Sequence, residues 1–185
     1  MAPGTFAVLT VGRVAAGTKS NIIPDRAVIE LNIRAYDDGT RTLLLDAIRR
    51  VVRAECAGSG SPTDPQFELY DEYPLTANDP EVTARVAAAF EAHFGESAST
   101  AARQSASEDF SAIPDALGIP YTYWALGGSD PERWHAAEAA GTLASEIPAN
   151  HSPSFAPVIQ PTLRTGTAAI VVAALSWLAA ESPDR

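Results

Sequence analysis

Residues 17–36 read GTKSNIIPDRAVIELNIRAY. From residue 27 onward, apolar and polar side chains alternate. One side of the expected ribbon carries Ala27, Ile29, Leu31, Ile33 and Ala35, and the other carries Val28, Glu30, Asn32, Arg34 and Tyr36. This period of two predicts a half-buried β-strand. The planar guanidinium of Arg34 suits a carboxylate, and Asn21 stands in the turn before the strand.

The segments on either side of this strand predict a small mixed unit. Residues 5–16 alternate in the same way and predict an antiparallel partner strand. Thr40 is expected to cap a helix that a Gly/Ser-rich tract at residues 58–62 ends, and residues 66–73 predict a third strand. The apolar stripe of this helix is Leu44, Leu45, Ile48, Val51 and Val52.

A domain boundary is expected near residues 74–80, which divides the chain into residues 1–77 and 78–185. The second part predicts helices at 80–95, at 131–141 and from Pro161 or Thr162 onward. Residues 121–126 predict a buried strand that ends at two glycines. The apolar run 167–180 is shorter than the roughly twenty residues that cross a bilayer, so a buried helix is expected there.

Composition excludes several classes of partner. The formal net charge of −10 argues against a nucleic acid or an anionic membrane, because both attract a basic surface. Cys56 is the single cysteine and excludes an internal disulfide. Residues 1–4 lack a basic region followed by an apolar one, so no secretory signal is predicted and the cytoplasm is the expected location.

His151 lies in an irregular loop between Pro148 and Pro153. A histidine held in such a loop suits a metal ligand or a catalytic base, and a hydrogen-bonded loop histidine is the plain alternative. His93 and His135 lie on expected helices without a partner at ligand spacing.

Glu108 and Asp109 are adjacent carboxylates. They either complement a short helix capped by Ser107 or orient a metal ligand from outside the first coordination shell. Arg34 has an ordinary alternative too, an ion pair with Glu30 or Asp25 on an exposed sheet face.

Three segments in order resemble the amidohydrolase branch of a large zinc-peptidase family, which includes aminoacylases, glutamate carboxypeptidases, carbamoylases and indole-acetyl-amino-acid hydrolases. These segments are Asn21-Ile22-Ile23-Pro24 with Arg34, then Ser107-Glu108-Asp109-Phe110, then His151-Ser152-Pro153-Ser154-Phe155. The resemblance spans essentially the whole chain, and it is the order of the motifs that makes it specific.

The resemblance implies an α/β fold with an α+β lid. Residues 1–77 are expected to be part of an incomplete ferredoxin-like lid and dimerisation domain, and residues 78–185 the C-terminal part of the catalytic domain. It also implies that Asn21 and Arg34 grip the carboxylate of a small-molecule substrate and that His151 binds a metal. Glu108 and Asp109 are implied to line the active site, where a carboxylate would orient a metal ligand without binding the metal.

The family's other metal ligands, its Glu-Glu pair and its lid histidine match nothing in this sequence. The expected function is therefore that of a metal-dependent amidohydrolase acting on N-acyl amino acids or related carboxylates, present here as a fragment inactive alone. Its divalent metal, zinc or else manganese or cobalt, is expected only with the missing half, and a homodimer through the lid is expected. The alternatives are a non-catalytic dimerisation or binding module and one half of a split enzyme.

Overall fold

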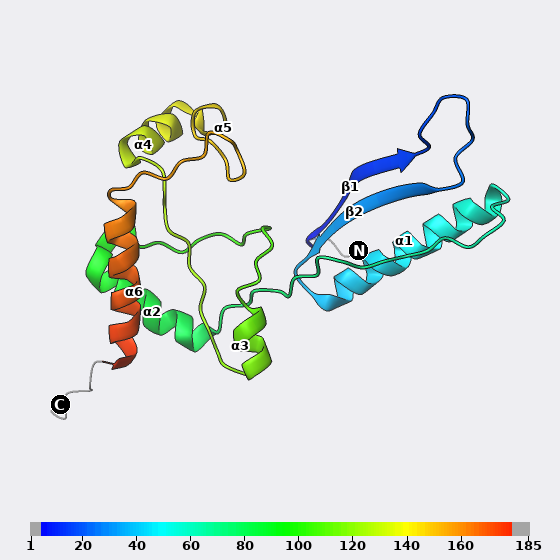
Figure 1. Cartoon of the computed structure of the whole chain (residues 1–185). Helices are drawn as coiled ribbons and strands as arrows, with labels where there is room; N and C mark the ends of the chain where they lie inside the picture. The colour runs from blue at the N-terminus through cyan, green and yellow to red at the C-terminus, as the bar shows by residue number, and fades with distance from the viewer. Residues whose placement is uncertain (1–4, 179–185) are drawn as a thin grey trace. The chain divides into compact units, whose positions relative to one another are not determined.

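The structure, a computed structural model, describes residues 5–178 (Figure 1). It is a mixed α/β chain with one two-stranded antiparallel sheet, so the expected α/β class is confirmed. The two expected N-terminal strands and the helices expected from residues 80, 131 and 162 are all present. The elements are β1 (Ala7–Ala16), β2 (Ala27–Ala35), α1 (Asp38–Gly58), α2 (Pro80–Phe94), a 3-10 turn (Gly95–Ser97), α3 (Ala112–Leu117), α4 (Pro131–Ala140), α5 (Leu143–Glu146) and α6 (Thr162–Leu178).

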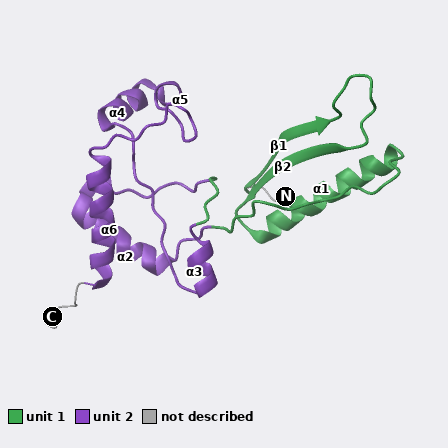
Figure 2. Cartoon of the chain, viewed as in Figure 1, with its two compact units in different colours: residues 1–75, 105–109 green, residues 76–104, 110–185 purple. Residues whose placement is uncertain are grey.

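The chain divides into two compact units (Figure 2). Unit 1 runs to Leu75 and also includes Ser105–Asp109, and unit 2 comprises Thr76–Gln104 and the chain from Phe110 onward. Unit 1 therefore contains a short segment that is far along the sequence from its main part. The roles of lid and catalytic domain expected for residues 1–77 and 78–185 stay a prediction.

A β-bulge sets the two faces of the hairpin in unit 1. Val11 pairs with Leu31 and Arg13 pairs with Glu30, so Gly12 is an extra residue in β1. Because of this extra residue, the apolar side chains of β1 lie on the same face as those of β2 on both sides of the bulge. The apolar face then carries Leu9, Val11, Val14, Ile29, Leu31 and Ile33, and the polar face carries Thr10, Arg13, Glu30, Asn32 and Arg34. Four side chains of the apolar face, those of Leu9, Val11, Val14 and Ile29, are between 49% and 67% exposed.

The prediction of a strand at residues 66–73 is wrong. This segment forms no ladder and instead contacts α1 through side chains. The Arg53 guanidinium lies 5.5 Å from the centre of the Phe67 ring, and Arg41 forms an ion pair with Glu72. A strand needs the backbone of a neighbour, whereas these contacts hold the segment along a helix.

Asp37, rather than Thr40, caps α1. The Asp37 carboxylate accepts bonds from the Thr40 backbone N–H at 2.7 Å and from the Thr40 hydroxyl at 2.8 Å. The expectation that Thr40 is the cap is therefore wrong, because its side chain is the donor to the true cap. These bonds stabilise the charged carboxylate and lower the pKa of Asp37 below its ordinary value of 3.8.

We expect Asp37→Ala to lower the melting temperature of unit 1, because it leaves N–H groups at the start of α1 without an acceptor. A group with a depressed folded-state pKa stabilises above its unfolded pKa, and that contribution is lost as the pH falls through the lower folded value. Asp37→Asn keeps the acceptor and serves as the control. Circular dichroism should find a smaller effect for the asparagine variant at pH 7 and no titration of this cap below about pH 4. Equal melting for all three proteins would contradict this account of the cap.

In unit 2, α2 packs against α6, and the buried residues of these two helices have small side chains. Val86 on α2 and Ala169 and Ala173 on α6 are buried. The Arg85 guanidinium lies 4.2 Å from the centre of the Trp177 ring, and its Nε donates to the Ser176 carbonyl at 2.7 Å. These contacts tie the two helices together along their length.

The expectation that α6 is a buried helix is wrong. Several of its large apolar side chains are exposed, among them Ile170 at 66% and Leu178 at 77%. The end of the expected run, at residues 179 and 180, lies outside the described residues. Among residues 5–178, no helix is long and apolar enough to span a membrane.

Residues 121–126 do not form the expected buried strand. The Asn78 amide instead holds this extended segment, donating to the Tyr123 carbonyl at 2.8 Å and accepting from its N–H at 2.7 Å. Trp124 is 38% exposed. Residues 97–107 also contain no strand, so unit 2, as far as residue 178, consists of helices and extended segments without a β-ladder.

Candidate functional site

Arg34 lies on the polar face of the hairpin, opposite Val8. Its Nε donates to Asn32 Oδ1 at 3.2 Å, and its Nη1 donates to the backbone carbonyl of Ser105. Glu30 forms an ion pair with Arg13 at 2.6 Å instead, and none of the ion pairs within residues 5–178 includes Arg34. The ordinary alternative, an ion pair from Arg34 to Glu30 or Asp25, is therefore not what the structure contains.

Asn21 lies in the exposed loop that joins β1 to β2. This loop begins at Gly17, which has a φ of 66°, and it follows the last pair of the hairpin, Ala16 with Ala27. Arg34 lies close to the other end of the hairpin, seven residues along β2 from Ala27. At about 3.3 Å per residue, Ala27 and Arg34 are about 23 Å apart along β2. The structure does not bring Asn21 and Arg34 together within one chain.

His151 lies in the exposed loop between α5 and α6 of unit 2. Its φ is 68°, a left-handed conformation that few residues other than glycine adopt. The neighbouring backbone is fixed by bonds from the Ser152 N–H to the Ala149 carbonyl at 3.1 Å and from the Phe155 N–H to the Ser152 carbonyl at 3.0 Å. Histidine is one of the residues that adopt this conformation more readily, so the φ agrees with both a metal ligand and an ordinary loop histidine.

Glu108 and Asp109 belong to the segment Ser105–Asp109 of unit 1. Glu108 is half-buried and Asp109 is exposed. The nearby helix α3 begins only at Ala112, with Ser111 as its N-terminal flanking residue. The interpretation that Ser107 caps a helix at this acidic pair is therefore wrong, because the chain is still extended at residue 107.

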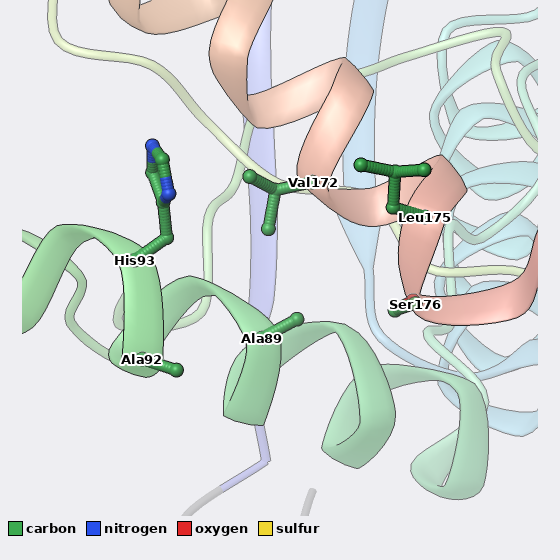
Figure 3. A pocket seen from close by; sticks show the side chains of 6 residues that line it. All are labelled: Ala89, Ala92, His93, Val172, Leu175 and Ser176. Carbon is green, nitrogen blue, oxygen red and sulfur yellow. The ribbon is translucent and has the colours of Figure 1, made fainter. Parts of the chain in front are cut away.

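The other two histidines have ordinary surroundings. His93 lines a shallow hollow between α2 and α6 (Figure 3). The remaining lining residues are Ala89, Ala92, Val172, Leu175 and Ser176, which offer at most one hydroxyl to a ligand. His135 is exposed on α4, with its Nδ1 3.7 Å from Glu138.

A divalent metal needs several protein ligands in one place. Within residues 5–178, no group of three or more histidine, cysteine, aspartate or glutamate side chains is placed to hold a metal ion. The described residues of this chain therefore do not fit a metal site by themselves, and no catalytic step through a metal follows from them. His151 remains a single candidate ligand.

Residues 7–149 match the Peptidase family M20/M25/M40. The chain belongs to this family. The match includes Asn21, Arg34, Glu108 and Asp109 and ends two residues before His151. It confirms the family resemblance that the three sequence motifs predicted.

Several M20/M25/M40 proteins are similar to parts of this chain. N-acetylcysteine deacetylase of Bacillus subtilis is 30% identical over 129 residues, which cover 70% of this chain and 33% of that protein. Thermostable carboxypeptidase 2 of Saccharolobus solfataricus is 39% identical over 79 residues, 43% of this chain and 20% of the relative. Hippurate hydrolase of Campylobacter jejuni is 33% identical over 81 residues, with the same two coverages.

A solved structure shares the fold of this M20/M25/M40 chain. The YXEP protein of Bacillus subtilis, described as a dinuclear metal-binding peptidase of the M20 family, superposes with a TM-score of 0.65 at 23% identity. The match covers 94% of this chain and 42% of that protein. The chain thus spans less than half the length of each of these relatives.

Sequence reasoning missed both partners of Arg34. Asn32 precedes Arg34 by two residues on the same face of β2, so the strand period itself carried that signal. Ser105 contacts Arg34 through a backbone carbonyl, 71 residues away, and a backbone group carries no sequence signal.

Proposed function

We propose that this chain is the C-terminal part of a metal-dependent amidohydrolase that cleaves the amide of N-acyl amino acids or related small molecules bearing a carboxylate. Family membership supports the reaction class. The names of two relatives refer to N-acetylcysteine and hippurate, and both compounds are N-acyl amino acids. The observation that carries the proposal is Arg34, a guanidinium on the polar face of the hairpin that is bound to neutral oxygens and to no carboxylate among the described residues.

Arg34 is proposed to bind the substrate carboxylate. A guanidinium presents five N–H donors, and the two contacts to Asn32 and Ser105 engage two of them. A carboxylate would form charge-assisted bonds, which are roughly twice as strong as neutral ones. Such a bond also orients the substrate, because the guanidinium fork is planar and rigid.

The remaining metal ligands and the general base are proposed to come from outside the described residues. His151 would supply one ligand to a divalent metal such as zinc, manganese or cobalt, and Glu108 and Asp109 would line the site. That metal would supply a polarised carbonyl and an activated water. The chain alone is then inactive. The completed enzyme, as the term is used below, is this chain together with the polypeptide that supplies the remaining ligands.

The exposed surface of the chain supports the proposal that a further polypeptide segment packs against it. The chain exposes 14770 Å², whereas two separate globular units of these sizes would expose about 10,000 Å² in total. The exposed large apolar side chains include Leu9, Val11, Val14 and Ile29 on the hairpin and Ile170 and Leu178 on α6. Large exposed apolar areas are typical of surfaces that other protein segments cover.

A homodimer through unit 1 is part of this proposal. Arg34 is about 23 Å along β2 from Ala27, the residue at which the loop that contains Asn21 ends. We infer that one small carboxylate contacts both Asn21 and Arg34 when the two residues come from two copies of the chain. The half-exposed apolar face of the hairpin offers each copy a surface to bury. The proposed partners include neither a nucleic acid nor a membrane. A cytoplasmic location stays a prediction.

We expect Arg34→Ala to raise the KM of the completed enzyme for N-acetyl amino acids by about 10-fold to 100-fold, because a hydrogen bond to a charged group contributes about 1.5–3 kcal/mol. The value of kcat should fall less, since the carboxylate is remote from the amide that is cleaved. Arg13→Ala is the matched control, because Arg13 lies on the same face and pairs with Glu30. An unaltered KM in the Arg34 variant would remove the proposed role.

A second candidate is a non-catalytic dimerisation or binding module. The exposed apolar face of the hairpin favours it, because such a face binds a partner without any metal chemistry. Light scattering on the chain should find a dimer, and Val14→Asp on that face should dissociate it, whereas Ile23→Asp in the 94% exposed loop position should not. A monomeric wild-type chain would count against the module.

A further inference from the structure

The segment Ser105–Asp109 is placed unusually. Its sequence neighbours on both sides belong to unit 2, but the segment itself belongs to unit 1. The chain therefore passes between the units three times, after Leu75, after Gln104 and after Asp109. The Arg34 guanidinium makes a hydrogen bond that ties this segment to the hairpin, through Nη1 and the Ser105 carbonyl.

The Ser105 carbonyl occupies a donor of Arg34 that a carboxylate would bind more strongly. The Ser105 carbonyl is neutral and binds one N–H, whereas a carboxylate has two charged oxygens that match the guanidinium fork. Arg34 Nε is already held by Asn32, so the Nη1 and Nη2 edge is the edge open to a bidentate ligand. A carboxylate on that edge takes the Nη1 donor that Ser105 uses.

We propose that the Ser105 carbonyl occupies, in the ligand-free chain, the position on Arg34 that a substrate carboxylate takes, and that the carboxylate displaces it. Displacement releases Ser105–Asp109 from the hairpin. This inference rests on the proposed role of Arg34 in binding the substrate. Its added content is that binding at Arg34 also moves a second segment of the chain.

Two consequences follow from the placement of the segment. Glu108 and Asp109 lie on it, so substrate binding repositions the acidic pair. The Ser105 contact also reduces affinity for any ligand that has to displace it.

Backbone ¹⁵N relaxation of the whole chain tests this inference, because it reports the order of each residue on the nanosecond scale. In the wild-type chain, order parameters of residues 105–109 should fall from about 0.85 to below about 0.6 when N-acetylglycine saturates the chain. N-acetylglycinamide, which lacks the carboxylate, should cause no change. Arg34→Ala should show the low values without ligand and no further response to N-acetylglycine.

Arg13→Ala is the control variant, since it removes a guanidinium from the same face without touching Ser105. It should keep residues 105–109 ordered until N-acetylglycine is added. If the Arg34 variant keeps the segment ordered, the contact does not hold it and the inference is overturned. If N-acetylglycine shifts the Arg34 Nε–H resonance while the segment stays ordered, the inference fails and the carboxylate role stands. A third outcome is that residues 105–109 lose order in the Arg34 variant but N-acetylglycine shifts no resonance of the wild-type chain. Both the displacement and the carboxylate role are then overturned, and only the hydrogen bond between Arg34 and Ser105 is supported.

Discussion

Val86→Asp is expected to unfold unit 2 and leave unit 1 folded. Val86 is 5% exposed and lies on α2, the helix that contacts α6. A carboxylate at this position would lose its hydration without gaining a partner, which costs at least about 3 kcal/mol. The few buried residues of unit 2 leave little stability to absorb that loss.

The three tryptophans make this result easy to measure. Trp124, Trp134 and Trp177 all belong to unit 2, so tryptophan fluorescence reports the unfolding of that unit alone. Val51→Asp is the control, because Val51 lies on α1 and is 53% exposed. The fluorescence transition in denaturant should vanish or shift strongly for Val86→Asp and stay unchanged for Val51→Asp. An unchanged transition in the Val86 variant would show that the packing of α2 on α6 does not hold unit 2 together.

His151→Ala is expected to lower kcat/KM of the completed enzyme at least about 100-fold, since even residues that only orient a metal ligand contribute 10-fold to 100-fold. Loss of an imidazole ligand also weakens the metal, so the variant should retain less than one equivalent per site after dialysis. Elemental analysis and hydrolysis of an N-acetyl amino acid measure the two effects.

His135→Ala is the control for this variant, because His135 is exposed on α4 and near only Glu138. It should keep both its metal and its activity. Full activity and metal content in the His151 variant would instead show that His151 is an ordinary loop residue.

Local patterns predicted the local structure well. The alternation from residue 27 predicted β2, and the helix-start sequences around Pro80 and Pro131 predicted α2 and α4 because a capping aspartate precedes each proline. The cap of α1 was misplaced by three residues, since both Asp37 and Thr40 suit a cap and only the structure orders them.

Strand predictions failed where a strand depends on distant partners. Residues 66–73 and 121–126 have strand-like composition, but neither segment has a neighbouring strand among the described residues. A helix closes its own hydrogen bonds, whereas a strand needs another segment to do so. The same limit applies to the site, where Arg34 was predictable from its face of the strand and its contact with the Ser105 backbone was not.

Hydrolysis of N-acetyl amino acids by the completed enzyme, measured with and without a metal chelator, tests the central claim most directly. The proposed function predicts hydrolysis that the chelator abolishes, that added divalent metal restores, and whose KM rises in the Arg34→Ala variant. Hydrolysis that survives the chelator, or none of any N-acyl amino acid by a metal-loaded completed enzyme, would contradict it.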